Sequence, residues 1–473
     1  MENKFYITTP IYYVNAKPHI GHAYTTIAAD AMARFYRQQL GGKNVFFLTG
    51  TDEHGQKIQK VAESAGKNPQ EFTDEIVGEF KDLWKKLDIK YDNFIRTTDE
   101  KHKKAVQKVL QTLFDKGAIY KGEYEGLYCV GCEQFKNESD LVDGKCPDHG
   151  TVPELLKEES YLLKLTDIQK ELIQKIESDE FKITPEKYKK EILSFLKNQE
   201  LRDVSVSRKN VSWGIPLPFD ENHTTYVWVD AFLNYLTGLG WDGDEKNIPE
   251  FWPADVQLIG KDILRVHATV WPAILLHLGI ELPKILFTHG HILSSGKKMS
   301  KTLGNTISID EMLDKFGTDG TRYLLLSAGT FGTDVDVTME RLAEKYNSDL
   351  ANGIGNLVSR ILKLCEGFNI EIKKSEYDPL VWNKGFIESL WLDKAIDRIW
   401  DHLIRKNNKF IDDNKPWELK KTNENKFKEV MEKLLADLDL ISDLISPFMP
   451  ETSEKIKEAL KNKKTKPLFQ RIK

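Results

Sequence analysis

Two short basic motifs hold the side chains with the most informative chemistry. The first, His19-Ile20-Gly21-His22, stands between an expected strand and an expected helix. The second, Lys298-Met299-Ser300-Lys301-Thr302, stands in a loop that is rich in glycine and serine. Imidazole, ammonium and backbone N–H groups are the donors that a polyphosphate needs. Because neither motif lies in a Walker loop, the pair predicts a polyphosphate site of a different kind.

A phosphate site built from these motifs would suit an attack on ATP. His19 and His22 would lie at the positive end of a helix, where Gly21 lets the backbone approach the ligand. Lys298 and Lys301 are flexible cations that could follow a departing pyrophosphate. When a carboxylate attacks the α-phosphate, charge grows on the equatorial oxygens, and fixed donors lower the barrier. Alone, the first motif would fit helix-capping or solvent-exposed histidines, and the second would fit a solvated lysine turn. The two together favour the phosphate site.

A parallel sheet must bring the two motifs together. Residues 4–9 and 44–49 predict strands, and residues 22–40 predict a helix between them. This order is a βαβ unit, whose strands are parallel. Further helices are expected over 69–87 and 99–116, and further parallel strands over 225–230, 256–260 and 284–288.

Gly260-Lys261-Asp262 ends one of these expected strands. Ligands of open α/β sheets bind at the carboxyl ends of the strands. The Asp262 carboxylate there could accept hydrogen bonds from ribose hydroxyls. A simple helix N-cap is the alternative for this aspartate.

Three cysteines and a histidine stand at the spacing of a metal site. The pattern Cys129-x2-Cys132-x13-Cys146-x2-His149 supplies three thiolates and an imidazole, a ligand set of tetrahedral Zn²⁺. Protein ligands would fill all four positions, so the predicted zinc, one per chain, is structural. Reduced cysteines without a metal are the alternative, and this spacing disfavours them.

The order of these patterns predicts an α/β protein with a Rossmann-like parallel-sheet catalytic domain followed by an α-helical bundle. Residues 1–118 and 223–285 would be the two halves of the catalytic domain, split by residues 119–222, an insertion that carries the zinc knuckle. Residues 286–340 hold the second basic motif. Residues 341–473 are expected to be helical, with helices near 386–412, 426–446 and 451–462.

Composition excludes a globally basic nucleic-acid binder. The 473 residues carry a formal net charge of −5, with 40% hydrophobic and 30% charged residues. Any RNA contact must therefore use local basic patches. No run approaches the ~20 apolar residues of a membrane helix, and no cleavable leader precedes the first strand. We expect a cytoplasmic protein without membrane contact.

Several motifs together carry a resemblance that covers essentially the whole chain. They are the two basic motifs, the single Cys3His knuckle and three further segments, Thr9–Asn15, Thr49–Gly55 and Tyr226–Ala231. In this combination the chain resembles the methionyl-tRNA synthetases, a family of class I aminoacyl-tRNA synthetases, in the short bacterial or organellar form. The second motif ends in Thr302 where the family pattern has serine, a departure that keeps the hydroxyl.

The resemblance implies a methionine–tRNA ligase that uses ATP, Mg²⁺ and a structural Zn²⁺. L-methionine would be activated to methionyl-adenylate and transferred to tRNA(Met), initiator and elongator alike. Residues matching the catalytic positions are His19, His22, Lys298 and Lys301. Residues matching the ATP-binding positions are His19, Gly21, His22, Gly260, Asp262, Ile292, Lys298 and Lys301. Residues matching the methionine pocket are Ile11, Tyr13, Asp52, Trp228, Ala231, Tyr235 and His267.

The chemistry of the matching pocket residues agrees with a thioether ligand. A methionine sulfur is apolar and polarizable, so aromatic walls from Tyr13, Trp228 and Tyr235 suit it, with His267 near the sulfur. Asp52 would pair with the α-ammonium group. Core packing is the alternative for some of these aromatic residues.

The resemblance also implies an anticodon site in the helical region. The matching residues are Asn356 and Arg360, one turn apart on a helix, and Pro416-Trp417 at the start of another. A tryptophan offers a stacking face for an unstacked base, while Asn and Arg can contact base edges or phosphate. Without the resemblance, Trp417 would be interpreted as a helix-end packing residue. Residues 286–340 would contact the tRNA stem.

Two alternative functions share some of these features, and the sequence also bears on the oligomeric state. A class I synthetase for another amino acid would share the nucleotide motifs, and an idle tRNA-binding relative would be expected to lose a motif histidine or lysine. None is lost. The chain stops soon after the helical region, without the dimer-forming extension of some relatives, so we expect a monomer.

Overall fold

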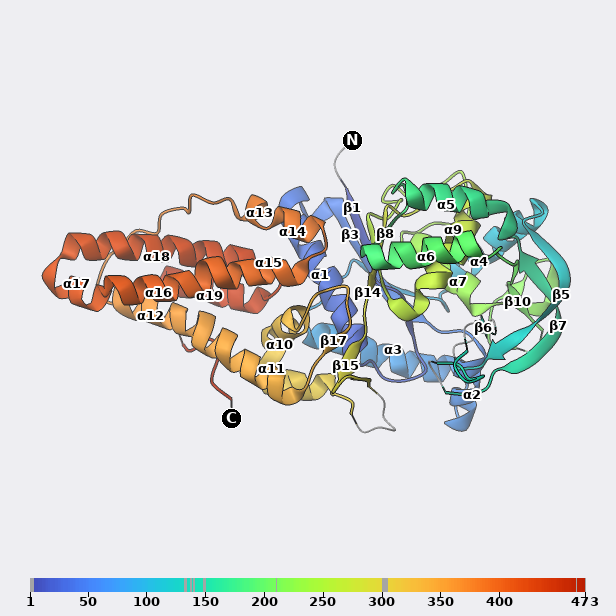
Figure 1. Ribbon diagram of the computed structural model, residues 1–473, viewed down its shortest axis with the longest axis horizontal. Coiled ribbons are helices and arrows are strands. Elements are labelled where there is room, and N and C mark those ends of the chain that lie inside the picture. Colours follow the sequence, from blue (N-terminus) through green and yellow to red (C-terminus); the bar gives the residue numbers. More distant parts are fainter. Residues whose placement is uncertain are drawn as a thin grey trace.

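The computed structural model describes residues 4–131, 134–136, 138, 141–147, 150–209, 211–299, 305–464 and 466–472. A sheet with helices around it forms one end of the molecule, and an elongated bundle of helices forms the other (Figure 1). Among the described helices, none is both long enough and apolar enough to cross a membrane.

A parallel sheet organises the first end. Its strand order is β2-β3-β1-β13-β14-β8, with β4 pairing with β3, and every pair is parallel. The strands are β1 (Phe5–Thr8), β2 (Tyr12–Tyr13), β3 (Val45–Asp52), β4 (Asn93–Arg96), β8 (Lys182–Thr184), β13 (Val256–Gly260) and β14 (Ile285–His289). The strands predicted over 4–9, 44–49, 256–260 and 284–288 are thereby confirmed.

Helices cover both faces of this sheet. Alternate residues of β1 enter different cores: Phe5 and Ile7 pack in one cluster, Tyr6 in the other. A strand buried on both faces needs mostly apolar residues, which Phe5, Tyr6 and Ile7 supply in β1. The helices are α1 (Ile20–Leu40), α2 (Gln56–Ser64), α3 (Pro69–Lys86), α4 (Glu100–Asp115) and α9 (Leu264–Leu278). The helices predicted over 22–40, 69–87 and 99–116 are confirmed as α1, α3 and α4.

The predicted strand over 225–230 is wrong. A strand β12 (Asp220–Thr225) ends where the prediction begins, and α7 (Val227–Phe232) and α8 (Asn234–Thr237) follow it. The β-branched and aromatic composition of this segment suggested a strand, but the propensity for strand is weak beside burial. Most of α7 is buried, so the same apolar residues satisfy a helix packed inside the protein.

Over its described residues, the predicted insertion holds two antiparallel sheets and two α-helices. The larger sheet has the order β6-β5-β7-β9 and the smaller one β10-β12-β11. Their remaining elements are β5 (Ile119–Cys129), β6 (Gln134–Lys136), β7 (Glu154–Leu163), β9 (Val204–Ser205), β10 (Ser207–Arg208), β11 (Pro216–Leu217), α5 (Gln169–Glu177) and α6 (Glu186–Asn198). One strand of this segment, β8, joins the main sheet beside β14, so the segment is not separate from the catalytic sheet. The predicted domain boundaries stay predictions.

A small sheet and a run of helices connect the two ends of the molecule. The sheet consists of β15 (Ile292–Ser294), β16 (Lys297–Lys298) and β17 (Val335–Asp336), in the order β16-β15-β17. The connecting helices are α10 (Ile309–Ser327), α11 (Met339–Lys345), a π-helical stretch over Tyr346–Gly355 and α12 (Asn356–Cys365).

The remaining helices form the bundle. They are α13 (Pro379–Trp382), α14 (Lys384–Glu388), α15 (Leu392–Ile399), a π-helical stretch over Trp400–Ile404, α16 (Arg405–Asn414), α17 (Pro416–Thr422), α18 (Glu424–Ile445) and α19 (Pro450–Asn462). The helices predicted near 426–446 and 451–462 are α18 and α19. The helix predicted near 386–412 is interrupted, because Leu390 adopts a positive φ of 57° between α14 and α15.

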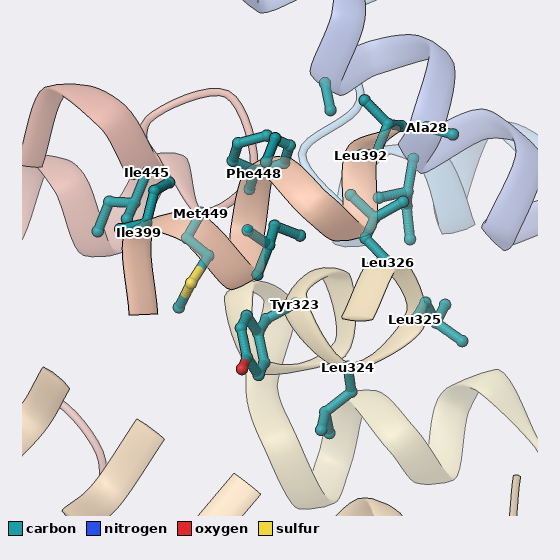
Figure 2. Close-up of a cluster of buried hydrophobic side chains, with 14 of the residues drawn as sticks. Ala28, Tyr323, Leu324, Leu325, Leu326, Leu392, Ile399, Ile445, Phe448 and Met449 are labelled. Carbon is teal, nitrogen blue, oxygen red and sulfur yellow. The ribbon is translucent and has the colours of Figure 1, made fainter. Parts of the chain in front are cut away.

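The sheet end and the bundle share a hydrophobic core. Ala28 of α1 and Leu326 of α10 lie beside Leu392 of α15 (Figure 2). Leu325 of α10 and Phe448 of the α18–α19 turn are buried in the same region. All belong to one cluster of buried side chains.

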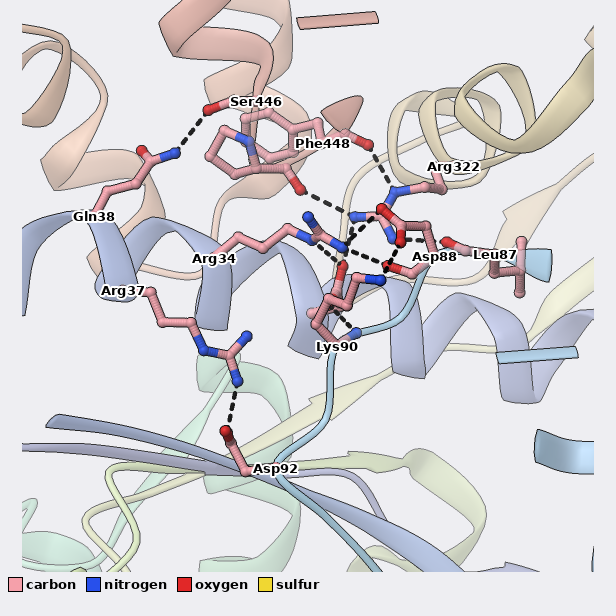
Figure 3. Close-up of polar contacts among 12 residues, drawn as sticks. Arg34, Arg37, Gln38, Leu87, Asp88, Lys90, Asp92, Arg322, Ser446 and Phe448 are labelled. Atoms are coloured by element: carbon pink, nitrogen blue, oxygen red, sulfur yellow. Dashed lines mark hydrogen bonds and ion pairs between the residues drawn. The ribbon is translucent and has the colours of Figure 1, made fainter. Parts of the chain in front are cut away.

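A buried arginine crosses the same junction. The Arg322 guanidinium donates from Nε to the Phe448 carbonyl at 2.9 Å and lies 2.7 Å from the fully buried Asp30 carboxylate of α1. It also donates to the carbonyls of Leu87 and Pro447 (Figure 3). A buried charge needs such complete pairing. The contacts tie α1, whose first turn carries the first basic motif, to the helical bundle.

Candidate active site

A cavity of about 630 Å³ opens at the carboxyl edge of the parallel sheet. Residues at or just after the ends of β1, β3, β13 and β14 line it. In the strand order, β1 lies between β3 on one side and β13 on the other, so the connections leave β1 in opposite directions. Open α/β sheets bind ligands at this kind of switch point.

The cavity collects the predicted site residues. Each catalytic, ATP-binding and methionine-binding residue predicted from the sequence lines it, apart from Lys301, which lies outside the described residues. Those that line it are Ile11, Tyr13, His19, Gly21, His22, Asp52, Trp228, Ala231, Tyr235, Gly260, Asp262, His267, Ile292 and Lys298. The fold therefore brings together side chains from both ends of the catalytic sequence, and their roles stay predictions.

The two histidines of the first motif cap α1. The His19 ring accepts a hydrogen bond at Nδ1 from the Gly21 N–H at 3.1 Å, and His22 accepts at Nδ1 from the His19 N–H at 3.3 Å. The rings stack with their centroids 3.7 Å apart. Because Nδ1 is an acceptor in both rings, Nε2 carries the proton in each neutral imidazole.

The environment keeps His22 uncharged. Burial, and then the neighbouring His19, lower the pKa of His22 well below its ordinary value. A neutral imidazole that donates from Nε2 can still stabilise growing negative charge on a phosphate. It does so beside the positive end of a helix dipole, which favours anions.

Two glycines leave room for the polar side chains. A Cβ at Gly21 would lie 3.0 Å from Cε1 of His19, and a Cβ at Gly260 would lie 2.7 Å from a carboxylate oxygen of Asp262. Both distances are shorter than ordinary carbon contacts. Glycine at these positions therefore lets the imidazole and the carboxylate fold back over the backbone.

The Asp262 carboxylate stands in a cationic environment. Burial acts to raise its pKa, but His291 and the Lys298 ammonium hold the pKa of Asp262 at about 2. His291 Nε2 lies 3.9 Å from the carboxylate, and Lys298 is on β16, paired with β15. Asp262 is thus a charged acceptor at neutral pH, which suits hydroxyl donors.

A buried pair of polar side chains closes the other part of the cavity. His267 donates from Nδ1 to the Ile263 carbonyl at 2.9 Å, so its Nε2 accepts from the Tyr235 hydroxyl at 2.9 Å. Burial lowers the pKa of His267 to about 4, which keeps the ring neutral. The Phe232 ring stands perpendicular to it, with centroids 4.9 Å apart. Both polar atoms of His267 are used within the protein, so this wall is largely apolar toward a ligand.

Sequence reasoning missed several cavity residues, among them His289, His291 and Lys57. His289 ends β14, where its ring contacts the Thr25 hydroxyl at 2.7 Å, and His291 follows it. The rule that singled out Asp262 at the end of β13 would have found both. Lys57 of α2 donates to the Gly131 carbonyl of the knuckle segment at 3.1 Å. Only the folded structure reveals that contact, because nothing in the sequence relates residues 57 and 131.

Comparisons with known proteins agree on one family. The family profile described as "tRNA synthetases class I (M)" matches residues 5–152 and 138–362. The chain belongs to the methionyl-tRNA synthetase family.

Relatives match along almost the whole chain. The methionine–tRNA ligase of Clostridium acetobutylicum is 46% identical over 97% of this chain and 73% of its own length. That of Rickettsia bellii is 42% identical over 97% of this chain and 93% of its own length. The structure of Mycobacterium tuberculosis methionyl-tRNA synthetase in complex with methionyl-adenylate is 35% identical, with a TM-score of 0.89 over 96% of this chain and 93% of that one.

The predicted zinc knuckle is described in part. Cys129 ends β5 and is buried, as is Cys146, while Cys132 and His149 lie outside the described residues. Both described cysteines adjoin Thr151: Cys129 Sγ is 4.0 Å from its hydroxyl, and the Cys146 N–H donates to its carbonyl at 2.8 Å. Both cysteines thus contact the same residue, and thiolates are among the ligands that Zn²⁺ prefers.

The predicted anticodon residues lie on α12, which packs against α18 and α19 of the bundle, and on α17. The Asn356 amide and the Arg360 guanidinium both donate to Asn408 Oδ1 at 3.3 Å, and Arg360 also pairs with Asp412 of α16. Four residues after Asp412, α17 begins at Pro416. α17 lies at the end of the bundle farthest from the sheet (Figure 1). Trp417 is 43% exposed there.

Proposed function

We propose that this chain is a methionine–tRNA ligase that activates L-methionine with ATP and transfers it to tRNA(Met). In the first step a methionine carboxylate oxygen attacks the α-phosphate of ATP, and pyrophosphate leaves. In the second step the 2′-hydroxyl of the terminal tRNA adenosine takes the methionyl group, and AMP leaves. Family membership and the single cavity that gathers the predicted residues support this proposal.

The phosphate end of the cavity supplies the groups for the first step. His19 and His22 offer Nε2 donors beside the N-terminus of α1, and Lys298 offers an ammonium on β16. Lys301 would join them from the same loop. These groups would stabilise the charge that grows on the α-phosphate and on departing pyrophosphate. Mg²⁺ bound to the ATP phosphates would neutralise part of their charge.

The neighbouring part of the cavity suits a methionine side chain. Tyr13, Trp228 and the buried Tyr235–His267 pair offer aromatic and weakly polar walls to a thioether. Asp52, at the end of β3, offers a carboxylate to the α-ammonium. Asp262, charged at neutral pH, would accept from the ribose hydroxyls.

The tRNA would span the two ends of the molecule. Trp417, exposed at the tip of the bundle, would stack on an anticodon base, while Asn356 and Arg360 would contact base edges or phosphate. A zinc ion held by Cys129, Cys132, Cys146 and His149 would stabilise the knuckle. Because one chain supplies every group named, we propose a monomer. We also propose that it acts in the cytoplasm and serves initiator and elongator tRNA.

Amino-acid-dependent ATP–pyrophosphate exchange tests the proposal. The zinc-loaded protein is assayed with methionine and, separately, with leucine, isoleucine, valine and cysteine. We expect exchange with methionine alone, followed by charging of tRNA(Met). Exchange with another amino acid would support the assigned phosphate chemistry and contradict the assigned methionine pocket. No exchange with any of them would favour an idle tRNA-binding protein.

A further inference from the structure

A chain of buried polar side chains lies behind the methionine part of the cavity. The Asp230 carboxylate lies 2.6 Å from Nδ1 of His54 through one oxygen and 2.8 Å from Nε2 of His102 through the other. His102 Nδ1 in turn lies 2.7 Å from the Thr237 hydroxyl. The four residues are 1%, 4%, 0% and 8% exposed, in the order Asp230, His54, His102 and Thr237. None of them lines the cavity.

The direction of each hydrogen bond follows from the chemistry of the groups. A carboxylate only accepts, so His54 donates from Nδ1 and His102 donates from Nε2. Burial acts to raise the pKa of Asp230, but His54 and His102 hold it below its ordinary value. Hydrogen bonds to such a charged acceptor are stronger than neutral ones.

This series of hydrogen bonds connects the elements that carry the predicted methionine-binding residues. His54 follows Asp52 by two residues at the end of β3. Asp230 lies on α7 between Trp228 and Ala231. Thr237 ends α8, two residues after Tyr235. His102 belongs to α4, which contributes no residue to the cavity lining, so it reaches the cavity walls only through Asp230 and Thr237.

The orientation of α7 depends on contacts outside the helix. With six residues, α7 is too short to hold a fixed orientation by its own hydrogen bonds. Trp228 and Ala231 stand three residues apart and share a face, whereas Asp230 lies on a different face. Pinning the Asp230 carboxylate between β3 and α4 therefore sets the rotation of α7 about its axis. That rotation decides where Trp228 points.

We propose that His54, Asp230, His102 and Thr237 position the walls of the methionine pocket and thereby determine its affinity for the amino acid. They act through Asp52, Trp228 and Tyr235 and are positioning residues that do not touch the substrate. The inference rests on the proposed function, since it assumes that methionine occupies this part of the cavity. Binding of ATP at the opposite part should not depend on them.

A pair of isosteric variants separates positioning from general stability. Asp230→Asn keeps the side-chain shape and removes the charge. Asp319→Asn does the same at a carboxylate that is also buried, at 5% exposure, but accepts from the Thr452 N–H at the bundle junction. The Michaelis constants for methionine and ATP in pyrophosphate exchange, and the melting temperature, are measured for both.

The expected results differ between the two variants. Asp230→Asn should raise the Michaelis constant for methionine about 10- to 100-fold, as a misplaced binding group does, and leave that for ATP within about twofold. Asp319→Asn should lower the melting temperature and leave both constants unchanged. An equal rise of both constants in Asp230→Asn, or a loss of thermal stability alone, would overturn the inference.

A second pair keeps the test decisive if Asp230→Asn does not fold. His102→Leu removes the donor to Asp230, and His102→Gln returns an amide donor at a similar place. We expect His102→Leu to raise the methionine constant and His102→Gln to recover most of the wild-type value. Identical effects of both variants would contradict a positioning role. Absence of methionine-dependent exchange in the wild-type protein would instead refute the proposed function.

Discussion

The cavity at the sheet edge and the tip of the helical bundle are built in opposite ways. Cavity residues come from many elements spread from β1 to β16, and buried pairs such as Tyr235–His267 support them. The tip uses adjacent helices and leaves Trp417 43% exposed. Arg360 there pairs with Asp412 of the next helix.

The contrast corresponds to the size of the ligand each region would bind. A small ligand is bound by enclosure in a cavity. Burial around this cavity lowers the pKa of His22 and of His267. A folded RNA is too large to enclose, and its unstacked bases meet exposed aromatic faces. Substitutions in the two regions should therefore affect different reactions.

The largest expected effect is on the phosphate chemistry. His22→Ala should lower the rate of methionine-dependent pyrophosphate exchange by about 10²- to 10³-fold, because it removes a fixed donor to the transition state. Methionine binding, measured by equilibrium dialysis, should change little. His402→Ala, at an exposed histidine of the bundle, is the control and should retain full exchange. Full exchange in His22→Ala would remove His22 from the mechanism.

Trp417→Ala tests the other region. It should lower the specificity constant for tRNA charging about 5- to 150-fold, which corresponds to one stacked base at about 1–3 kcal/mol. Pyrophosphate exchange should be unaffected. The matched control is Trp391→Ala, since Trp391 is 54% exposed and directly precedes α15. α15 lies nearer the sheet end than α17 (Figure 1). If both variants charge tRNA equally well, the tip is not the anticodon site.

The free energy of unfolding should depend on pH through the buried His267. The pKa of His267 is about 4 in the folded protein and 6.5 in the unfolded protein. The contribution of neutral His267 to the free energy of unfolding is therefore complete above pH 6.5 and is lost as the pH falls toward 4. Between pH 7 and pH 5 this amounts to roughly 2 kcal/mol of unfolding free energy. Urea unfolding of His267→Gln should show a correspondingly smaller decline than His402→Gln. Parallel declines would show that His267 does not titrate in this way.

The smallest effect is expected from one methyl group. Gly21→Ala places a Cβ 3.0 Å from Cε1 of His19. Displacement of that ring should slow pyrophosphate exchange about 3- to 10-fold. Gly42→Ala introduces a Cβ with no atom within 4 Å and serves as the control. Equal exchange in both would show that the His19 ring position is not critical.

Much of the fold was predictable because the periodic patterns are strong. β1, β3 and α1 match the βαβ unit expected from residues 4–49. The segment 225–230 was not predictable: its β-branched and aromatic residues indicate a strand, yet burial inside the protein makes it helix α7. The interruption of the helix near residue 390 was also not predicted, because a single residue with positive φ does not alter the hydrophobic periodicity of the sequence.

The candidate site was predictable where a motif carries it and not where only packing does. His19, Asp52 and Lys298 stand in segments whose order and spacing resemble the family. His102 has no motif, and its link to Asp230 spans 128 residues of sequence. The contact between Lys57 and Gly131 is equally invisible along the chain.

By itself, the sequence determined which chemical groups this protein carries and which family it resembles. Residue types and short spacings are local properties, and local backbone geometry translates them directly into a capped helix or a strand end. The tertiary structure alone decided which of those groups meet, which imidazoles stay neutral and which carboxylates stay charged. Those properties depend on burial and on partners from distant segments, such as Tyr235 for His267 and His102 for Asp230.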